Sequence, residues 1–317
     1  MGRRLLFPLV LLSLPLFAAA SDSFGLSIDM APAYPHPGDA IVLTATSYSG
    51  SADTAYVWNV DGKTVLSGIG EKTLHMPAGA LGSEDIVDVS AQENGTSLGS
   101  ARAIVRPADI DLVWEGKTSV PPLYPGLPLP NSASTVSVLA VPHLYRGGRE
   151  LPSQTLLYSW SVNGVPLASE SGYGNASALV TPPNFAQPFT VSVHVEDTSG
   201  TIAGESETTI SPQVPRVNIY EYAPLVGIRF EKNIAGMFTL SGSEVSFAAF
   251  PFFVNDPAQL SYQWSLDGSA FDVDPARPLD VTFRKTGNAT GPHQVQFSLA
   301  NRKNFVENVA ATFILSL

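Results

Sequence analysis

A pattern of alternating apolar and polar residues recurs along the chain and predicts β-strands. It is clearest in three similar segments, 56–62 (YVWNVDG), 158–164 (YSWSVNG) and 262–268 (YQWSLDG). Because successive strand residues point to opposite faces, the Tyr, the Trp and the following Val or Leu share one face of each strand. The pattern therefore predicts that Trp58, Trp160 and Trp264 are structural core residues, each at the centre of its own hydrophobic core.

Each of these segments ends in Asp-Gly or Asn-Gly, a pair that adopts positive φ easily and predicts a tight hairpin turn. Trp160 follows Trp58 by 102 residues (160 − 58), and Trp264 follows Trp160 by 104 (264 − 160). That spacing is typical of one β-sandwich domain per repeat.

A second alternating segment follows each Trp by about 30 residues and predicts another half-buried strand. These segments are 86–91, 189–197 and 295–300. Each is followed by a polar turn and a last predicted strand, at 101–105, 205–210 and 309–315. Every repeat is therefore expected to close with a hairpin, and no segment has a sustained helical period.

The second and third repeats share a further segment, 136–142 and 245–251, which follows Trp114-Glu115 in one and Tyr220-Glu221 in the other. Prolines near 107 and at 212–215 mark the boundaries. The expected organisation is all-β, with immunoglobulin-like sandwich domains at 21–106, 107–215 and 216–317, joined as a semi-rigid rod. The Pro-rich stretch 121–130 is expected to be a loop or an edge segment, because Pro cannot donate to a β-ladder.

The first 20 residues have the pattern of a secretory signal peptide. Arg3 and Arg4 precede an apolar run over 5–17, and three alanines at 18–20 offer a cleavage site before Ser21. The run is shorter than the ~20 residues that span a bilayer. We expect an exported chain, extracellular, at the cell surface or periplasmic, with no transmembrane segment after cleavage. An uncleaved anchor is the alternative.

The Tyr-x-Trp strand, its Gly turn and the segment 189–200 (FTVSVHVEDTSG) resemble PKD domains and related bacterial immunoglobulin-like domains. The resemblance covers nearly all of residues 22–317. It implies a β-sandwich repeat of the kind that serves as a spacer or an adhesive module on cell surfaces and secreted enzymes.

Composition narrows the function further. The net charge is −11, from 17 Lys and Arg against 28 Asp and Glu, which disfavours nucleic acids and anionic membranes as partners. There is no cysteine, so disulfides, thiolate zinc sites and thiol catalysis are excluded. Charged residues make up 14% and apolar residues 44%, as suits an extracellular β-protein with several cores.

No pattern of titratable residues indicates catalysis, and we expect no catalytic residue, no cofactor and no metal site. The five histidines are His36, His75, His143, His194 and His293, and no two of them have the spacing of metal ligands. The acidic pairs are Glu84-Asp85, Glu196-Asp197 and Asp272-x-Asp274. The last pair, with Asp267 and Asp280 nearby, is the best candidate for calcium, and turn-forming acids are the alternative reading.

Aromatic residues outside the repeated core positions could form a binding surface for a protein or a glycan. They are Trp114, Tyr124, Tyr220 and Tyr222, with Tyr173 as a further candidate. Packing of Trp114 into a domain junction is the alternative.

The sequence favours a secreted or cell-surface, non-enzymatic structural or adhesive module that contacts an unknown protein or glycan at the cell envelope. A carbohydrate-binding protein is the alternative, and a hydrolase with an unrecognised site is a remote one, since sandwich folds also host enzymes.

Overall fold

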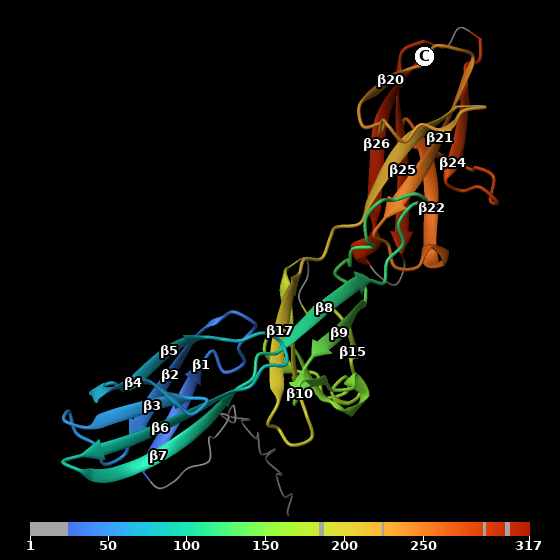
Figure 1. The fold of residues 1–317 in the computed structure, drawn as a ribbon. Helices are drawn as coiled ribbons and strands as arrows, with labels where there is room; N and C mark the ends of the chain where they lie inside the picture. Colours follow the sequence, from blue (N-terminus) through green and yellow to red (C-terminus); the bar gives the residue numbers. More distant parts are fainter. Residues whose placement is uncertain (1–24, 184–186, 224, 288–289, 302–304) are drawn as a thin grey trace, which may run out of the picture. The chain divides into compact units, whose positions relative to one another are not determined.

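A computed structural model describes residues 25–183, 187–223, 225–287, 290–301 and 305–317 (Figure 1). The predicted signal peptide at 1–20 lies outside these residues. Within them the secondary structure consists of β-strands and short 3-10 turns, with no α-helix. The predicted all-β class is therefore confirmed.

The first strand set lies between residues 26 and 105. It contains β1 (Leu26–Ala31), β2 (Ala40–Ser47), β3 (Ala55–Val60), β4 (Lys63–Ile69), β5 (Thr73–Pro77), β6 (Asp85–Glu93) and β7 (Thr96–Val105). These strands form one sheet in the order β1-β2-β5 and a second sheet in the order β4-β3-β6-β7.

The second strand set lies between residues 109 and 210. It contains β8 (Asp109–Gly116), β9 (Val136–His143), β10 (Tyr145–Arg146), β11 (Arg149–Glu150), η1 (Ser153–Thr155), β12 (Leu157–Val162), β13 (Val165–Pro166), β14 (Gly172–Tyr173), β15 (Ser177–Val180), β16 (Phe189–Glu196) and β17 (Ala203–Ile210). Its main sheets have the orders β15-β9-β8 and β13-β12-β16-β17.

The third strand set lies between residues 216 and 316. It contains β18 (Arg216–Ala223), β19 (Gly227–Ile228), β20 (Met237–Thr239), β21 (Glu244–Phe252), η2 (Pro257–Gln259), β22 (Leu260–Leu266), β23 (Ser269–Phe271), β24 (Asp280–Arg284), β25 (Pro292–Asn301), η3 (Phe305–Glu307) and β26 (Val309–Ser316). Its sheets have the orders β19-β18-β21-β24 and β20-β26-β25-β22-β23, with β20 parallel to β26.

One strand order repeats in all three sets. In each set the first two long strands and the strand before the last hairpin form one sheet, as in β1-β2-β5. The third long strand pairs with the first strand of the last hairpin in the other sheet, as in β4-β3-β6-β7. This order is that of immunoglobulin-like sandwiches, in which a Trp on the third strand is buried between the sheets. The Trp-bearing strands β3, β12 and β22 occupy that third position.

The first and third strand sets each pack one hydrophobic core between their two sheets. In the first, Leu43 of one sheet shares a core with Trp58 and Val89 of the other. In the third, Phe247 shares a core with Trp264, and the Trp264 ring lies 4.8 Å from that of Phe297, its register partner on β25. Alternate residues of β16 in the second set are buried in the same way.

The chain divides into two compact units whose limits differ from the predicted domain boundaries. Among the described residues, unit 1 comprises 25–110, 142–157 and 194–205, and unit 2 comprises 111–141, 158–193 and 206–317 with its gaps. Strands of the second set therefore contribute to both units. The boundaries at 106/107 and 215/216 stay a prediction.

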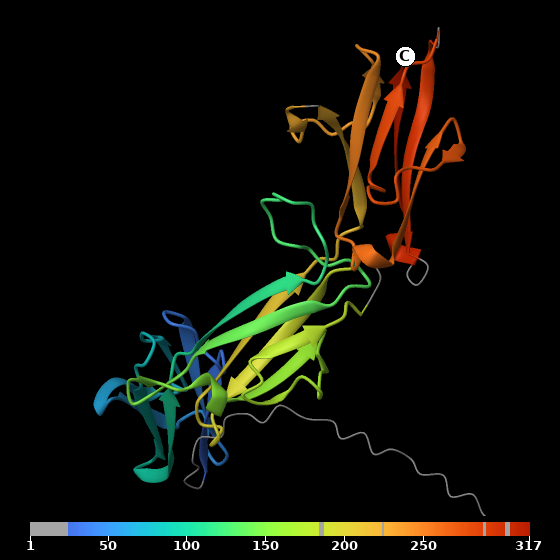
Figure 2. The same cartoon turned by 90° about the vertical axis from the view of Figure 1, so that its right-hand side faces the viewer.

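The Pro-rich stretch 121–130 forms no strand, as predicted, and belongs to the long connection between β8 and β9. Figure 2 shows this connection as an open green loop beyond the end of β8.

Candidate functional site

The three predicted core tryptophans are buried, with 0%, 1% and 0% of Trp58, Trp160 and Trp264 exposed. Each indole N–H also has the same kind of partner. It donates to a backbone carbonyl in the connection that follows, at Glu71 (2.8 Å), Asn175 (2.9 Å) and Pro278 (3.2 Å). These residues are therefore part of the scaffold, with their polar atoms used inside the fold.

The predicted surface aromatics are not gathered into one exposed face. Trp114 is half-buried on β8, and Tyr124 is half-buried in the β8–β9 connection. Tyr222 is 38% exposed and Tyr173 is 62% exposed. No ring contact joins Trp114 to Tyr222 among the described residues.

Tyr220 is buried, with 8% exposed, so its predicted place on a binding surface is wrong. Its ring packs edge-on against Phe230 at 5.3 Å and Phe250 at 5.8 Å, and Asn218 Nδ2 donates to its hydroxyl. The cause is tertiary. Residues 227–234 fold back along β18, with Ile234 N donating to the Ile219 carbonyl, and Phe230 of this segment packs on the Tyr220 ring.

Tyr124 belongs to an aromatic cluster within unit 2. Its ring lies 5.7 Å from that of Phe252 and 6.1 Å from that of Phe253, both edge-on. The Arg216 guanidinium lies over the same two phenylalanines, at 5.2 and 5.4 Å from the ring centroids. The packing of Tyr124 holds the connection against the third strand set, while the cation–π contacts of Arg216 join residues within that set.

The acids proposed for calcium have local partners instead. Asp267 accepts from the Gln294 N–H and contacts His293 Nδ1 at 2.7 Å, while Asp274 accepts from the Ala276 N–H. Asp280 forms an ion pair with Arg277. In the part of the chain that the structure describes, no three His, Asp or Glu side chains gather as a metal site. The turn-forming reading fits these contacts.

Four of the five histidines lie close to a carboxylate, His293 beside Asp267 among them. His36 lies 3.3 Å from Asp109, His143 lies 2.9 Å from Glu150, and His194 lies 3.8 Å from Glu196. His194 is half-buried on the outward-facing side of β16, and its ring lies 4.9 Å from that of Tyr34.

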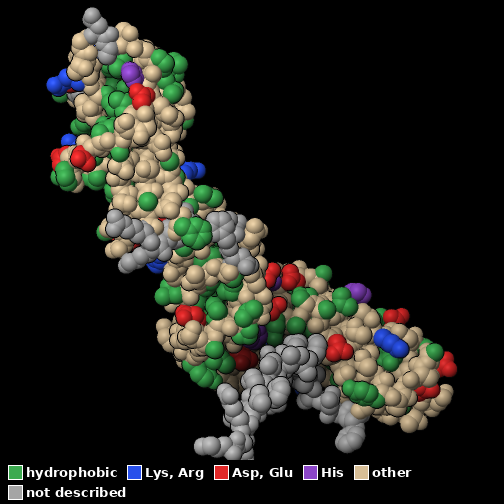
Figure 3. Space-filling view, turned by 180° about the vertical axis from the view of Figure 1, so that it is seen from behind, with side chains coloured by type: hydrophobic (Ala, Val, Ile, Leu, Met, Phe, Trp, Pro, Cys, Tyr) green, Lys and Arg blue, Asp and Glu red, His purple; other side chains and the backbone are tan. Residues whose placement is uncertain are grey.

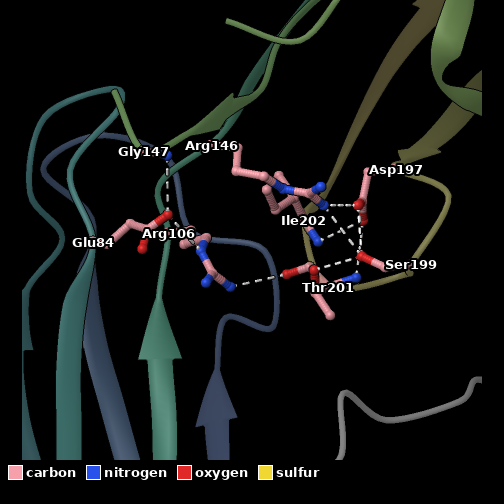
Figure 4. A network of polar contacts seen from close by, with 8 residues as sticks. All are labelled: Glu84, Arg106, Arg146, Gly147, Asp197, Ser199, Thr201 and Ile202. Carbon is pink, nitrogen blue, oxygen red and sulfur yellow. Dashed lines mark hydrogen bonds and ion pairs between the residues drawn. The ribbon is translucent and has the colours of Figure 1, made fainter. Parts of the chain in front are cut away.

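A polar network within unit 1 is centred on Asp197, the second acid of the Glu196-Asp197 pair (Figure 4). Asp197 is 5% exposed and ion-pairs with Arg146. It accepts from Ser199 Oγ (2.6 Å) and from the N–H groups of Thr201 (2.9 Å) and Ile202 (3.0 Å). Burial raises the pKa of this carboxyl, but these hydrogen bonds and the Arg146 charge outweigh burial and lower the pKa below the usual Asp value.

Glu84 and Arg106 extend the network toward the first strand set. Arg106 Nε lies 3.0 Å from Glu84 Oε1 as an ion pair without the alignment of a hydrogen bond, and its Nη1 donates to the Thr201 carbonyl at 3.2 Å. The contact with Arg106 lowers the pKa of the Glu84 carboxyl. The same carboxylate accepts from the Gly147 N–H at 3.5 Å (Figure 4).

A second buried network, within unit 2, was not suggested by the sequence. Glu307 is 0% exposed, and its carboxylate accepts from Asn131 Nδ2 (3.0 Å), the Asn255 N–H (2.5 Å) and Asn301 Nδ2 (2.7 Å). Asn131 also donates to the Phe253 carbonyl at 2.8 Å. These residues are far apart in sequence and show no shared spacing, so no local signal could have found them.

Both networks join segments of different strand sets, and the buried carboxylates of Asp197 and Glu307 accept hydrogen bonds inside the protein, as buried polar groups require. On the face in Figure 3, charged side chains are sparse and scattered among uncharged ones.

No helix among the described residues is both long enough and apolar enough to cross a membrane.

No family model matches the chain, and no curated protein matches it. Solved structures similar to it include the three N-terminal domains of the bacteriophage RB49 Highly Immunogenic Outer Capsid protein (Hoc), with 17% identity, 93% of this chain and 98% of that chain covered, and a TM-score of 0.28.

The central fibronectin-III array of RIM-binding protein is also similar, with 10% identity, 94% and 96% covered, and a TM-score of 0.31. Fibronectin(III)-like modules of Clostridium thermocellum CbhA match with 12% identity, 59% and 94% covered, and a TM-score of 0.29. Likenesses this remote carry no argument about the function of this chain.

Proposed function

We propose that this chain is an exported, non-enzymatic interaction module of tandem immunoglobulin-like sandwiches of the PKD kind, acting at the cell envelope or in an extracellular assembly. The observation that carries the proposal is the repeated strand order of the sandwiches. Each Trp-bearing strand ends in the same kind of turn, and each indole N–H donates to a backbone carbonyl of a later connection.

The polar chemistry supports this role. Asp197 accepts from the backbone N–H groups of Thr201 and Ile202 in its own loop. Glu307 accepts from Asn131 of the second strand set and from Asn301 of the third. A catalytic carboxylate would instead face a space that a substrate could enter, with a partner group in reach. The arrangement suits a scaffold whose exposed surfaces make contacts while its interior stays fixed.

A crosslinking experiment on intact producing cells tests the interaction role. We expect a discrete crosslinked species that contains this chain and an envelope or extracellular protein. Purified chain assayed on general glycosidase and protease substrates should be inactive. Turnover that co-purifies with the chain and is lost when Asp197 or Glu307 is replaced would overturn the proposal.

Export is tested separately through the first 20 residues. The mature protein in the exported fraction should begin at Ser21, as read by N-terminal sequencing. A Leu11→Asp/Leu12→Asp variant, which interrupts the apolar run, should accumulate inside the cell with residues 1–20 attached. Export of that variant at the parent level would contradict the signal-peptide assignment.

The positions of the aromatic side chains weaken the hypothesis of a carbohydrate-binding surface, because Tyr220 is buried and Tyr124 packs on Phe252 and Phe253. It predicts glycan-array binding that Tyr222→Ala or Trp114→Ala reduces. Binding that neither substitution changes would exclude this surface as a sugar site.

A further inference from the structure

The first strand of the third set, β18, is covered on both of its sides. It pairs with β21 on one side and with the antiparallel strand β19 on the other. The chain continues from β19 along this outer side, where the Arg229 N–H donates to the Glu221 carbonyl at 2.9 Å. Further along, the Ile234 N–H donates to the Ile219 carbonyl at 2.7 Å. Residues 227–234 therefore act as an added strand of this sheet.

The added segment also covers part of the outer face of the sheet. Tyr220 is buried, and its ring packs against Phe230 of the segment and Phe250 of β21. The rings of Phe230 and Phe250 lie 5.2 Å apart. Arg229 of the same segment lies 3.4 Å from Glu221. A first strand of this fold thus accepts an extended segment that carries an apolar and a basic side chain.

The strand β8 holds the place of β18 in the second set, but it has no added segment. It pairs with β9 as β18 pairs with β21, and among the described residues no strand pairs with its outer edge (Figure 1). The connection after β8 runs instead to the third set. There Tyr124 packs on Phe252, and the Ser119 N–H donates to the Val254 carbonyl at 2.6 Å.

The pairing of β8 with β9 places the side chains that surround this edge. Just beyond the two strands, the Lys117 N–H donates to the Thr135 carbonyl at 2.8 Å. Counting four residues inward along each strand places Val113 (117 − 4) beside Leu139 (135 + 4). Both side chains are exposed and so lie on the outer face of the sheet, away from the core.

The same pairing shows which backbone groups point to the open edge. Backbone N–H and C=O groups alternate between the two sides of a strand, and those of Val113 point to β9. Those of Leu112 and Trp114 therefore point outward. In agreement, the Gly116 N–H donates away from β9, to the Pro128 carbonyl at 2.9 Å. Such an edge can pair with a strand of another chain.

Apolar side chains surround the open edge on the outer face. Four of them are between 38% and 59% exposed, namely Val113, Leu139, Val141 and Leu179. Leu139 lies opposite Ser177 on β15, two residues before Leu179, so the two leucines share one face. We call these four side chains, together with the edge at 112–114, the β8 surface. A grouped apolar surface of this kind marks an interaction site.

The opposite edge of the same sheet is capped by a charged side chain. On β15, the Leu179 N–H donates to Glu170 Oε2 at 3.0 Å. A carboxylate that occupies an edge N–H hinders the addition of another strand there. A strand that joins this sheet is therefore expected at β8.

Charge decides which kind of strand fits. The strands β8, β9 and β15 contain Asp109, Asp111 and Glu115 and no Lys or Arg. Lys117, just beyond β8, pairs with Glu115. A second copy of β8 laid antiparallel would bring the acids of both strands together, which is unfavourable. A strand with basic residues would meet opposite charges.

From these observations we propose that the β8 surface binds an extended segment of a different protein, which adds to β8 as an antiparallel strand. One apolar side chain of the segment packs on Val113 and Leu139. Asp111 and Glu115 share the face of Val113, so Lys or Arg stands two residues before and two residues after the apolar one. This inference rests on the proposed interaction role and names the chemistry of the partner.

The test is an NMR titration of the full chain with the peptide Thr-Lys-Thr-Phe-Thr-Lys-Thr, blocked at both ends. We expect a Kd of about 10 μM to about 1 mM and slower hydrogen exchange at the amides of Leu112 and Trp114. The matched control is Thr-Thr-Lys-Phe-Lys-Thr-Thr. It has the same composition and charge but puts both Lys on the face opposite to Phe, so it should bind about three- to tenfold more weakly.

A variant pair tests the surface on the protein. Val113→Ser/Leu139→Ser should weaken binding of the first peptide at least about fivefold and keep the Tm of the parent, because both positions are exposed. Val65→Ser/Ile69→Ser, two exposed positions on β4, is the matched control and should bind like the parent.

Three results would overturn the inference. They are unchanged exchange at Leu112 and Trp114 at about 1 mM peptide, equal binding of the two peptides, and equal binding by the two variants. Self-association of the parent that Val113→Ser/Leu139→Ser abolishes would assign the surface to a second copy and overturn it as well. A crosslinked envelope protein found alongside any of these results would still support the proposed function, so the two failures are distinguishable.

Discussion

At the residue scale, each buried tryptophan contributes both packing and a hydrogen bond. The indoles of Trp58, Trp160 and Trp264 lie on the third strand of their sets, and each N–H donates to a carbonyl 13 to 15 residues later. The ring fills the space between the sheets, and the N–H fixes the connection that crosses over it. Losing such a residue removes a large apolar volume and leaves a carbonyl without its donor.

Replacing any of these tryptophans by Ala should lower the free energy of unfolding by about 3–5 kcal/mol. Urea titration followed by circular dichroism measures the loss, and hydrogen exchange locates it in the strand set that carries the substitution. Trp114→Ala, at a half-buried position, is the control and should cost clearly less. Parent-like stability in any of the three variants would contradict the role of that Trp as a core residue.

Glu307 is the second residue for which a single substitution is decisive. Its buried carboxylate accepts from Asn131, Asn255 and Asn301. Glu307→Ala removes the shared acceptor of these donors from a buried site and should cost about 3 kcal/mol. Glu231→Ala, at an exposed position, should change stability by less than about 0.5 kcal/mol. Equal effects of the two substitutions on the urea midpoint would show that the network contributes little.

Asp197 gives the chain a predictable pH dependence. Its folded-state pKa is lowered, so its stabilising contribution is present above the unfolded value of about 3.9 and is lost as the pH falls through the folded value. The stability difference between the parent and Asp197→Asn should therefore be constant at neutral pH and shrink below about pH 4. Urea titrations of both proteins from pH 7 to pH 2 measure it, and a difference that grew on acidification would have the wrong sign.

At the element scale, one turn performs the same task in all three sets. Asp61, Asn163 and Asp267 begin the tight hairpin after the Trp strand, with φ of 50°, 47° and 49°. Each side chain accepts a backbone N–H from the neighbouring strand, at Ile86 (3.0 Å), Thr190 (2.9 Å) and Gln294 (2.8 Å). Each backbone N–H donates back to the carbonyl of that same residue. The turn therefore also fixes the end of the adjacent strand.

Asn163→Gly separates the two roles of this turn. Gly accepts the positive φ, so the hairpin should form, but the bond to the Thr190 N–H is lost. We expect a loss of about 1 kcal/mol and faster hydrogen exchange at Thr190. Asn163→Asp, which keeps the acceptor, should behave like the parent. If both variants match the parent, the cross-strand bond does not contribute.

At the scale of the whole molecule, polar contacts between strand sets matter more than the low charge content suggests. Charged residues make up only 14% of the chain, yet Glu84, Arg106, Arg146 and Asp197 all belong to one network in unit 1. The contact between Arg106 and the Thr201 carbonyl joins residues that are 95 positions apart in the sequence. Such a network restrains one strand set against the next within unit 1.

Arg106→Ala removes the contacts with Glu84 and the Thr201 carbonyl. The strands of the first set should stay protected, while hydrogen exchange at 199–202 should rise several-fold, because the Thr201 carbonyl loses its donor. Arg102→Ala, which removes a pair with Asp88 inside the first set, is the matched control and should leave 199–202 unchanged. Identical exchange in the two variants would show that the Arg106 contacts do not restrain this segment.

The sequence by itself determined the strands, the hairpin turns and the inward position of each Trp. These depend on side chains alternating between two faces and on the φ that a turn residue accepts, both of which are local properties. The burial of Tyr220 and the network of Glu307 depended on the tertiary structure. Residues 227–234 cover Tyr220, and Glu307 collects donors from 131, 255 and 301. No local pattern records which distant segments will meet, because that is fixed only when the sheets pack.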